Sequence, residues 1–391
     1  MKKGLTFLML LTIVLGLIGC EDNKETEKTP IKPELEVEYV YSTYTNPVSV
    51  IYENGSDYKA EVADPSIVRG DDGLFYIFAT GGVVLKSEDA CNWVVHDTKV
   101  LPSMPTWDVD VWGYGVNPGI WAPDVIKIGD KWIYYYSLSA WGKCCGIGLA
   151  VADEITGPYE DLGKLFDYKE IGIENAIDPH VFVEDDGTVY MSVGSFQGLF
   201  LLQLTSDGLE LEGGVETQAR DKVRIAGKVG GWDGSTYEGS YIIKKDGYYY
   251  YFGSAGTCCE GKKSTYRVLV GRAEEITGPY LDSNGRPLTS SGSGKTFGTL
   301  CLDTGITNKN MAGAGHNSIL VDDAGDYWIY YHAYSIADNY ATRHLFMDKL
   351  AWDENGFPYV SYTYTNDEGE EKTSKIKPSF QIELDGPRFI A

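Results

Sequence analysis

The stretch Asp178-Pro-His-Val-Phe, followed by the pair Asp186-Gly187 and the segment Thr-Val-Tyr-Met-Ser, decides the fold of this chain. It contains a polar residue, a proline step, a short apolar run, a turn and a strand with an aromatic residue. An Asp-Gly pair supplies the positive φ that tight hairpin turns require. The stretch therefore predicts two antiparallel strands joined by a tight turn.

The same pattern occurs four more times along the chain. The first residue of each copy, here called its lead residue, lies 58, 56, 60 and 78 positions after the previous one, and the lead residues are Asp64, Ala122, Asp178, Glu238 and His316. Each interval can hold a four-stranded blade with its loops. Five such units predict an all-β fold, a five-bladed β-propeller, in which radial repetition hides most sheet edges. A β-sandwich, or two unrelated β-domains, would produce this spacing only by chance.

The composition favours many short strands and a neutral partner. The chain has 29 Tyr, 9 Trp, 13 Phe and 46 Gly, and it shows no long helical periodicity. Aromatic residues and frequent turn residues are typical of strands. A formal net charge of −24 argues against nucleic acid as a partner, because phosphate binding needs a Lys- and Arg-rich surface. A neutral substrate fits this charge best.

The N-terminus has the pattern of an export signal. Lys2 and Lys3 precede an apolar run over residues 5–18, which is too short for a comfortable membrane span. Leu17-Ile-Gly-Cys20 resembles the bacterial lipobox, whose cysteine carries lipid; the alternative is an ordinary signal peptide with an incidental cysteine. We expect a signal peptide over residues 1–20, a flexible tether over 21–37 and the propeller over 38–391. The expected location is the cell envelope, at the outer membrane or cell surface, with Cys20 as the membrane anchor.

Six further cysteines leave several disulfide pairings open. They include two vicinal pairs and lack the C-x-x-C spacing and histidine partners of a zinc site. Export permits disulfides, and bridges within or between the vicinal pairs are both compatible with the sequence. The cysteines are Cys91, Cys144, Cys145, Cys258, Cys259 and Cys301.

The lead positions carry the chemistry. The innermost strand of each propeller blade starts near the axis, so the five lead residues should converge at one end of the channel. Three of them are carboxylates and one is a histidine. Ionised groups of like sign raise one another's pKa when they are buried together, and such clusters usually perform proton transfer. A purely structural propeller has no reason to gather acids at its axis.

Several motifs now support a resemblance. In chain order they are Ala63-Asp64-Pro65, Trp121-Ala-Pro-Asp124-Val, Asn175-Ala-Ile-Asp178-Pro, Tyr237-Glu238-Gly-Ser, Gly315-His316-Asn317-Ser and Leu350-Ala-Trp-Asp-Glu-Asn-Gly-Phe-Pro358. Their order and spacing resemble glycoside hydrolase family 43, from about Ala63 to Pro358. The resemblance implies a five-bladed propeller and an inverting enzyme that acts on arabinose- or xylose-containing glycans, without an organic cofactor.

The resemblance also implies roles for individual residues. Asp64 corresponds to the general base, Glu238 to the general acid and Asp178 to the residue that tunes and positions the acid. His316 corresponds to a residue at the channel centre beside a bound metal, often calcium, that is held largely through water. Inversion needs the acid and base about 6.5–9.5 Å apart to admit water, and Asp178 should raise the pKa of Glu238. The chain departs from the commonest acid motif by having Gly239-Ser240 where many relatives have Ala-Pro.

The expected substrate contacts come from residues beside these motifs. Ser137-Leu-Ser-Ala-Trp-Gly and Cys258-Cys-Glu-Gly261 look similar to segments of endo-α-1,5-L-arabinanases, which predicts an arabinan or its oligosaccharides as substrate. Trp121 and Phe196 are candidate sugar platforms, and Asn175 and Arg343 are candidate polar contacts; a surface ion pair is the alternative for Arg343. Trp107, Trp112 and Trp141 either extend a cleft or pack between blades, and we expect His180 and His332 to be core residues.

Rival interpretations keep the fold and change the substrate or the activity. A β-xylosidase, an exo-acting α-L-arabinofuranosidase and a galactan-directed enzyme would share the same carboxylates. A non-catalytic glycan-binding propeller is a further alternative, although all three acid positions are filled. The sequence leaves endo or exo action, metal identity and oligomeric state open.

Overall fold

The computed structural model describes residues 37–107, 118–140, 144–230, 232–366 and 368–390. The expected signal peptide with Cys20, residues 21–36 of the expected tether, Trp112 and Trp141 lie outside the described residues. Within the described ranges, no helix is long and apolar enough to cross a membrane.

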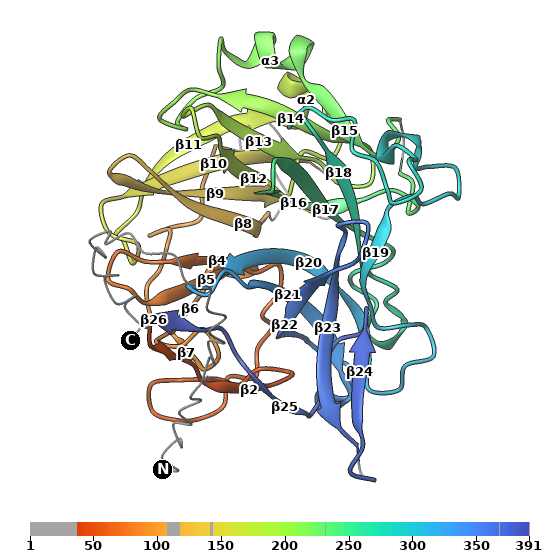
Figure 1. Ribbon diagram of the computed structural model, residues 1–391. Helices are drawn as coiled ribbons and strands as arrows, with labels where there is room; N and C mark the ends of the chain where they lie inside the picture. Colours follow the sequence, from red (N-terminus) through yellow and green to blue (C-terminus); the bar gives the residue numbers. More distant parts are fainter. Residues whose placement is uncertain (1–36, 108–117, 141–143, 231, 367, 391) are drawn as a thin grey trace, which may run out of the picture.

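Five antiparallel sheets stand in a ring around a common centre (Figure 1), which confirms the predicted five-bladed propeller. Blade 1 contains β4 (Ser66–Arg69), β5 (Phe75–Ala79), β6 (Val83–Ser87), β7 (Trp93–Val95) and the parallel edge strand β3 (Val50–Ile51). Blade 2 contains β8 (Gly119–Ile128), β9 (Lys131–Ser139), β10 (Cys145–Ala152) and β11 (Glu160–Asp167). Blade 3 contains β12 (His180–Val183), β13 (Val189–Val193), β14 (Leu199–Leu204) and β15 (Val223–Ala226).

The remaining blades follow the same order. Blade 4 contains β16 (Glu238–Lys245), β17 (Tyr248–Ala255), β18 (Arg267–Ala273) and β19 (Thr299–Asp303). Blade 5 contains β20 (Met311–Val321), β21 (Tyr327–Ser335), β22 (Arg343–Trp352), β23 (Pro358–Thr365) and β24 (Glu371–Lys375). Two short helices, α2 (Tyr168–Ile171) and α3 (Val215–Asp221), lie at the outer edge near blades 2 and 3 (Figure 1). Each predicted hairpin forms the first two strands of a blade.

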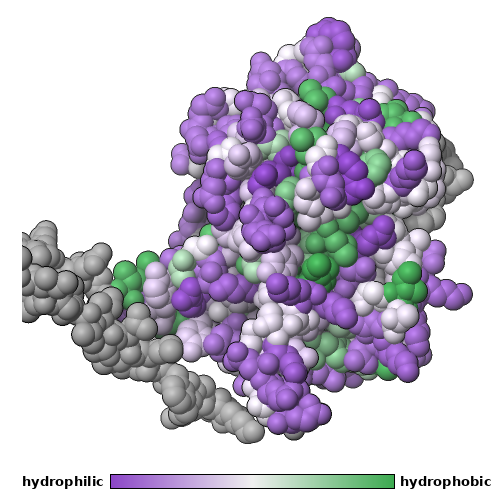
Figure 2. Space-filling model, turned by 45° about the vertical axis from the view of Figure 1, so that its right-hand side comes forward, coloured by the Kyte–Doolittle hydropathy of each residue, from purple (hydrophilic) through white to green (hydrophobic). Residues whose placement is uncertain are grey.

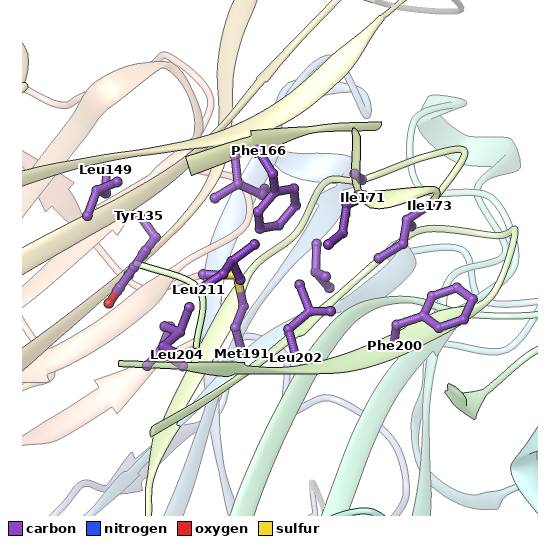
Figure 3. Close-up of a cluster of buried hydrophobic side chains, with 14 of the residues drawn as sticks. Tyr135, Leu149, Phe166, Ile171, Ile173, Met191, Phe200, Leu202, Leu204 and Leu211 are labelled. Carbon is purple, nitrogen blue, oxygen red and sulfur yellow. The ribbon is translucent and has the colours of Figure 1, made fainter. Parts of the chain in front are cut away.

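The core consists of layers between neighbouring blades. Strand β9 buries nearly every residue because both of its faces pack against other blades. Figure 3 shows one such layer, where Phe166 of blade 2 meets Met191 and Leu202 of blade 3, each at most 1% exposed. Burial of apolar area at about 25 cal/mol per Å² is the main force that holds the sheets together. The face in Figure 2 is mostly hydrophilic, and apolar side chains gather near its middle.

Polar side chains in the first strands of the blades join neighbouring blades. Ser66 of blade 1 donates to Asp124 Oδ1 of blade 2 at 2.9 Å, and Asp124 Oδ2 accepts the N–H of Val181 in blade 3 at 2.7 Å. Tyr241 OH of blade 4 donates to the carbonyl of Ile319 in blade 5 at 3.3 Å. Because these groups are buried, each bond satisfies a donor and an acceptor that water cannot reach.

The two ends of the chain close the ring on blade 5 and blade 1. Strand β1 (Tyr39–Val40) pairs with β26 (Phe389–Ile390), and β2 (Thr43–Thr45) pairs with β25 (Glu383–Asp385). Between them Asn46 is fully buried and donates to the carbonyl of Met347 at 2.6 Å and to Ser379 Oγ at 2.8 Å. The N-terminal segment therefore belongs to the fold of the last blade.

Candidate active site

At the start of each blade one residue has a positive φ, and in blades 2, 4 and 5 that residue lies in a β-bulge. Asp64, Ala122, Asp178 and His316 have φ values of 56°, 37°, 60° and 50°, and Gly239 has 57°. Positive φ is unfavourable for residues other than glycine, so packing around the axis must hold these conformations. Bulges of this kind re-aim side chains beside active sites.

Glu238 lies one residue before the position that the repeat predicts. It pairs with Ser254 as Trp121 pairs with Ser137 and as Gly315 pairs with His332. Gly239 therefore takes the backbone place of the other lead residues. Blades 2 and 4 both turn through two residues, because Ile128 pairs with Lys131 and Lys245 pairs with Tyr248, whereas blades 1, 3 and 5 have longer loops. The turn begins seven residues after Ala122 (129 − 122) but eight after Glu238 (246 − 238), so Glu238 lies one residue further from its turn.

The backbone N–H of each of these positive-φ residues donates to a group on the preceding blade. Four acceptors come from one position of the second strand or just after it: Thr80 Oγ1 for Ala122, Ser137 Oγ for Asp178, Ser254 Oγ for His316 and His332 Nδ1 for Asp64, at 2.8–3.1 Å. In blade 3 that position is Gly194, which has no side chain. Asp178 Oδ2 accepts the N–H of Gly239 in its place at 3.0 Å. Asp178 is thereby fixed beside the backbone that carries Glu238.

Asp64 is a buried carboxylate held in its ionised form. Thr80 donates to Oδ2 at 2.5 Å, His316 Nδ1 lies 3.1 Å from Oδ1, and Arg343 donates to Oδ1 at 3.5 Å. Burial alone raises the pKa of Asp64, but His316 and then Arg343 outweigh burial and hold that pKa well below the ordinary value. An ionised carboxylate at this position can accept a proton from water.

Glu238 is held in the opposite state. Ser195 donates to Oε2 at 2.7 Å and Tyr266 donates to Oε1 at 2.8 Å. Burial, followed by the charge of Asp178, raises the pKa of Glu238 to about 8, against the lowering effect of these two donors. Glu238 is therefore protonated at neutral pH and can donate a proton. Burial outweighs the neighbouring charge that the sequence led us to expect as the cause.

The two histidines beside Asp64 differ in charge. Burial lowers the pKa of His316, but Asp64 and Asp178 outweigh it and raise that pKa to about 9. Burial lowers the pKa of His332 to about 4. His332 Nδ1 already accepts the N–H of Asp64, so its 3.3 Å approach to Asp64 Oδ1 joins two acceptors and is no ion pair. His316 supplies the positive charge, and His332 positions the backbone.

A cavity of about 530 Å³ lies beside Glu238. Trp121, Asn175 and Phe196, three candidate substrate contacts from the sequence, line it. Trp232 also lines the cavity; its ring lies 4.4 Å from that of Phe196 and the residue is 62% exposed. This volume is in the range of sites for small ligands.

Arg343 lies next to Asp64 rather than in the cavity wall. Its guanidinium makes two bonds to Glu61, at 2.7 and 2.9 Å, and its side chain is 12% exposed. The guanidinium also donates to Asp64 Oδ1, so its positive charge acts on Asp64.

Trp107 donates from Nε1 to Tyr136 OH at 3.1 Å and packs against blade 2.

Among the described residues, the cysteines form one disulfide bridge. Cys258 and Cys259 form a disulfide. Cys91, Cys144, Cys145 and Cys301 are free thiols, and both vicinal pairs line the cavity.

The residues near His316 do not make a cage for calcium. Calcium takes six to eight oxygen ligands, and the described residues contain no cluster of three His, Cys, Asp or Glu side chains that could hold a metal. His316 offers one imidazole whose Nδ1 already contacts Asp64. The donor set therefore does not fit a calcium ion bound by protein ligands.

Several residues of the site escape the sequence analysis. Ser195 and Tyr266 contact Glu238, and Glu61 pairs with Arg343. His332 is buried, as expected for a core residue, and its Nδ1 also accepts the N–H of Asp64. None of these residues belongs to the motifs quoted from the sequence, although His332 occupies the second-strand position that Ser137 and Ser254 hold in their blades. Ser195 and His332 could have been found from the sequence by their position, because each lies in or just after the second strand of a blade.

The match to known proteins agrees with this geometry. The model of the glycosyl hydrolases family 43 matches residues 58–358. The chain belongs to this family and is therefore a glycosidase.

Three relatives illustrate the family. An extracellular exo-α-(1→5)-L-arabinofuranosidase of Cellvibrio japonicus is 35% identical over 77% of this chain and 87% of its own length. An extracellular endo-α-(1→5)-L-arabinanase of Bacillus subtilis is 32% identical over 75% of this chain and 86% of its own length. The structure of an α-L-arabinanase from Cellvibrio cellulosa with arabinohexaose superimposes with a TM-score of 0.66 at 34% identity, over 78% of this chain and 96% of that one.

Proposed function

We propose that this glycosidase hydrolyses α-1,5-linked arabinofuranosyl chains with inversion, using Glu238 as general acid and Asp64 as general base. The supporting observation is the opposite protonation of two buried carboxyls on blades 4 and 1, one with a pKa raised to about 8 and one with a pKa held low. Pairs of carboxyls whose environments push their pKa values apart are typical of acid–base assignments.

The proposed reaction needs one proton donor and one proton acceptor. Glu238 gives its proton to the glycosidic oxygen as the bond to the anomeric carbon breaks. Asp64 takes a proton from water, whose oxygen attacks that carbon from the opposite face. The oxocarbenium-like transition state is flanked by the charge of Asp64. Asp178 raises the pKa of Glu238 and binds the N–H of Gly239, so it keeps the acid protonated and in place.

The relatives support arabinan as the substrate. Two are described as enzymes that act on α-(1→5)-linked arabinose, and one is an arabinanase in complex with arabinohexaose. Trp121, Phe196 and Asn175 line the cavity, which supports them as contacts to the sugar chain. A second candidate is exo-acting arabinofuranosidase activity, which the Cellvibrio japonicus relative favours. Product analysis separates the two, because endo attack releases mixed oligosaccharides early and exo attack releases one product throughout.

The experiment is incubation with linear arabinan, arabinoxylan, galactan and aryl pentosides, followed by chromatography of the products. Arabinan cleavage that is lost in Glu238→Gln supports the proposal. Turnover of xylan or galactan without arabinan would overturn the substrate, and near-normal activity of Glu238→Gln would overturn the acid assignment.

We also propose that the protein is exported and lipid-anchored through Cys20. The relatives are described as extracellular, and the lipobox-like segment precedes Cys20. Metabolic labelling with a radioactive fatty acid should mark the wild type and leave Cys20→Ala unlabelled. Labelling of both proteins would contradict the anchor.

A further inference from the structure

The Cys258–Cys259 disulfide lies in the wall of the cavity that contains Glu238. Cys258 is half-buried and Cys259 is exposed, and both residues line the cavity beside the proposed acid. The bridge follows β17, the strand whose Ser254 pairs with Glu238. The bridge therefore belongs to the same blade as the proposed acid.

Global stability does not explain this bridge. A disulfide stabilises a fold mainly by closing a loop in the unfolded chain, and the effect grows with loop length. The two cysteines are adjacent in sequence, so the bridge ties no distant segments together. Its consequence is local and concerns the shape and chemistry of the surface at this point.

The loop around the bridge is held firmly. The N–H of Thr257 donates to Thr265 Oγ1 at 3.1 Å, and the N–H of Thr265 donates to the carbonyl of Thr257 at 3.1 Å. The N–H of Glu260 donates to Ser264 Oγ at 2.9 Å. At Gly256, with φ of 101°, a Cβ atom would lie 2.4 Å from the carbonyl oxygen of Thr265. A backbone fixed in this way presents the sulfur atoms in one orientation.

The chemistry of the bridge suits the C–H surface of a sugar. Sulfur is polarisable and makes favourable apolar contacts, and a disulfide carries no N–H, O–H or S–H that would need a partner. The cavity wall also contains the aromatic rings of Trp121, Phe196 and Trp232 and several polar groups, Asn175 and Glu260 among them. Apolar walls with a few polar groups are typical of ligand sites.

We propose that the Cys258–Cys259 disulfide is the apolar wall of a subsite that binds a pentose ring of the substrate beside the linkage cleaved at Glu238. This inference rests on the proposed function. Reduction replaces the rigid bridge by two mobile thiols, so the subsite loses its fixed wall while Glu238 and Asp64 keep their contacts.

The experiment compares oxidised and reduced enzyme on arabino-oligosaccharides. Treatment with tris(2-carboxyethyl)phosphine, with complete reduction verified by alkylation and mass, should raise KM about five- to tenfold and change kcat by less than about twofold. Reoxidation should restore KM. The double variant Cys258→Ser/Cys259→Ser should show the raised KM without reductant and should not respond to it, which controls for effects elsewhere.

Unchanged KM after complete reduction, with melting temperature unchanged, would overturn the subsite. A decrease in kcat by the same factor as the increase in KM would also overturn the subsite, because the bridge would then act on the reacting groups or on folding. If the oxidised wild type fails to cleave arabinan at all, the proposed function fails instead. The two failures are therefore distinguishable.

Discussion

At the scale of single residues, the opposite protonation of Glu238 and Asp64 depends on different surroundings. Glu238 has neutral donors, Ser195 and Tyr266, and the anionic neighbour Asp178. Asp64 has the cations His316 and Arg343. Both carboxyls are buried, so the sign of the nearest charge decides which of them keeps its proton.

The first prediction concerns the pH dependence of activity. A general acid must be protonated, so kcat/KM should be maintained below the pKa of Glu238 and should fall about tenfold per pH unit above about 8. The measurement is kcat/KM on arabino-oligosaccharides from pH 4 to 10. In Asp178→Asn, which removes the second-largest cause of the raised pKa, the alkaline limb should move to lower pH. An alkaline limb that stays in place would contradict the role of Asp178.

The second prediction concerns stability. The pKa of Glu238 rises from 4.5 to about 8 on folding, so the folded state binds more protons than the unfolded state between these values. Its contribution to stability is present below pH about 4.5 and is lost as pH rises through about 8. Glu238→Gln removes this loss, and by urea denaturation it should be more stable than wild type at pH 9 by about 1–3 kcal/mol.

The comparison between pH values makes this prediction specific. At pH 5 the advantage of Glu238→Gln should shrink to within about 0.5 kcal/mol. Glu354 is exposed, and Glu354→Gln is the matched control, with no pH-dependent difference expected. A variant with the same stability difference at both pH values would show that Glu238 does not titrate as described.

At the scale of elements, the positive-φ residue at the start of each blade is fixed by a hydrogen bond to the preceding blade. Ser137 of β9 is fully buried and its Oγ accepts the N–H of Asp178 at 2.9 Å. This contact links the second blade to the position of the residue that tunes the acid.

The third prediction tests this link. Ser137→Ala leaves the buried N–H of Asp178 without a partner, which costs about 1–3 kcal/mol. Thermal or urea unfolding should show that loss, and kcat should fall because Asp178 is less well fixed. The control is Ser361→Ala in β23, where the hydroxyl makes a half-buried contact with the carbonyl of Ser374. Equal stability of the two variants would contradict the prediction.

At the scale of the whole molecule, ring closure brings the site together. Asn46 sits between the N-terminal segment and blade 5, with bonds to both backbone groups of Met347. Asp348, next to it, accepts bonds from Tyr331 and from the N–H of Ser379, so the C-terminal segment joins the same cluster.

The fourth prediction follows from this cluster. Asn46→Ala leaves buried backbone groups of Met347 unpaired and should lower the free energy of unfolding by about 2–4 kcal/mol. Calorimetry or urea denaturation measures the loss. Asn54, which is exposed and bonds only within its own turn, gives the control Asn54→Ala with little change. Wild-type stability of Asn46→Ala would show that closure depends on other contacts.

The sequence predicts the propeller and its acids because the pattern repeats within each blade. Hairpin register, turn residues and blade spacing are local, and the structure confirms the five blades. The offset of Glu238 could not be predicted because it depends on the pairing register of the first two strands of blade 4, which the sequence motif does not show. The partners of Asp64 escape because His332 lies 268 positions away and no local pattern marks that contact.

The substrate side is predicted less completely for the same reason. Trp121 and Phe196 are next to motifs and line the cavity. Trp232 lies in a connecting segment outside the repeats, and the sequence analysis does not single it out. Arg343 was a candidate substrate contact, but its guanidinium binds Glu61 instead. The sequence does not show this partner, because Glu61 lies beside Arg343 only when the ring closes.

The most direct test of the whole account is the anomeric configuration of the first product. The proposed roles of Glu238 as acid and Asp64 as base for an attacking water imply a single displacement. Proton NMR during hydrolysis of an α-1,5-arabino-oligosaccharide should show the β-anomer first, followed by mutarotation to the α-anomer. An α-anomer formed first would mean a double displacement, and the acid–base assignment of Glu238 and Asp64 would be wrong.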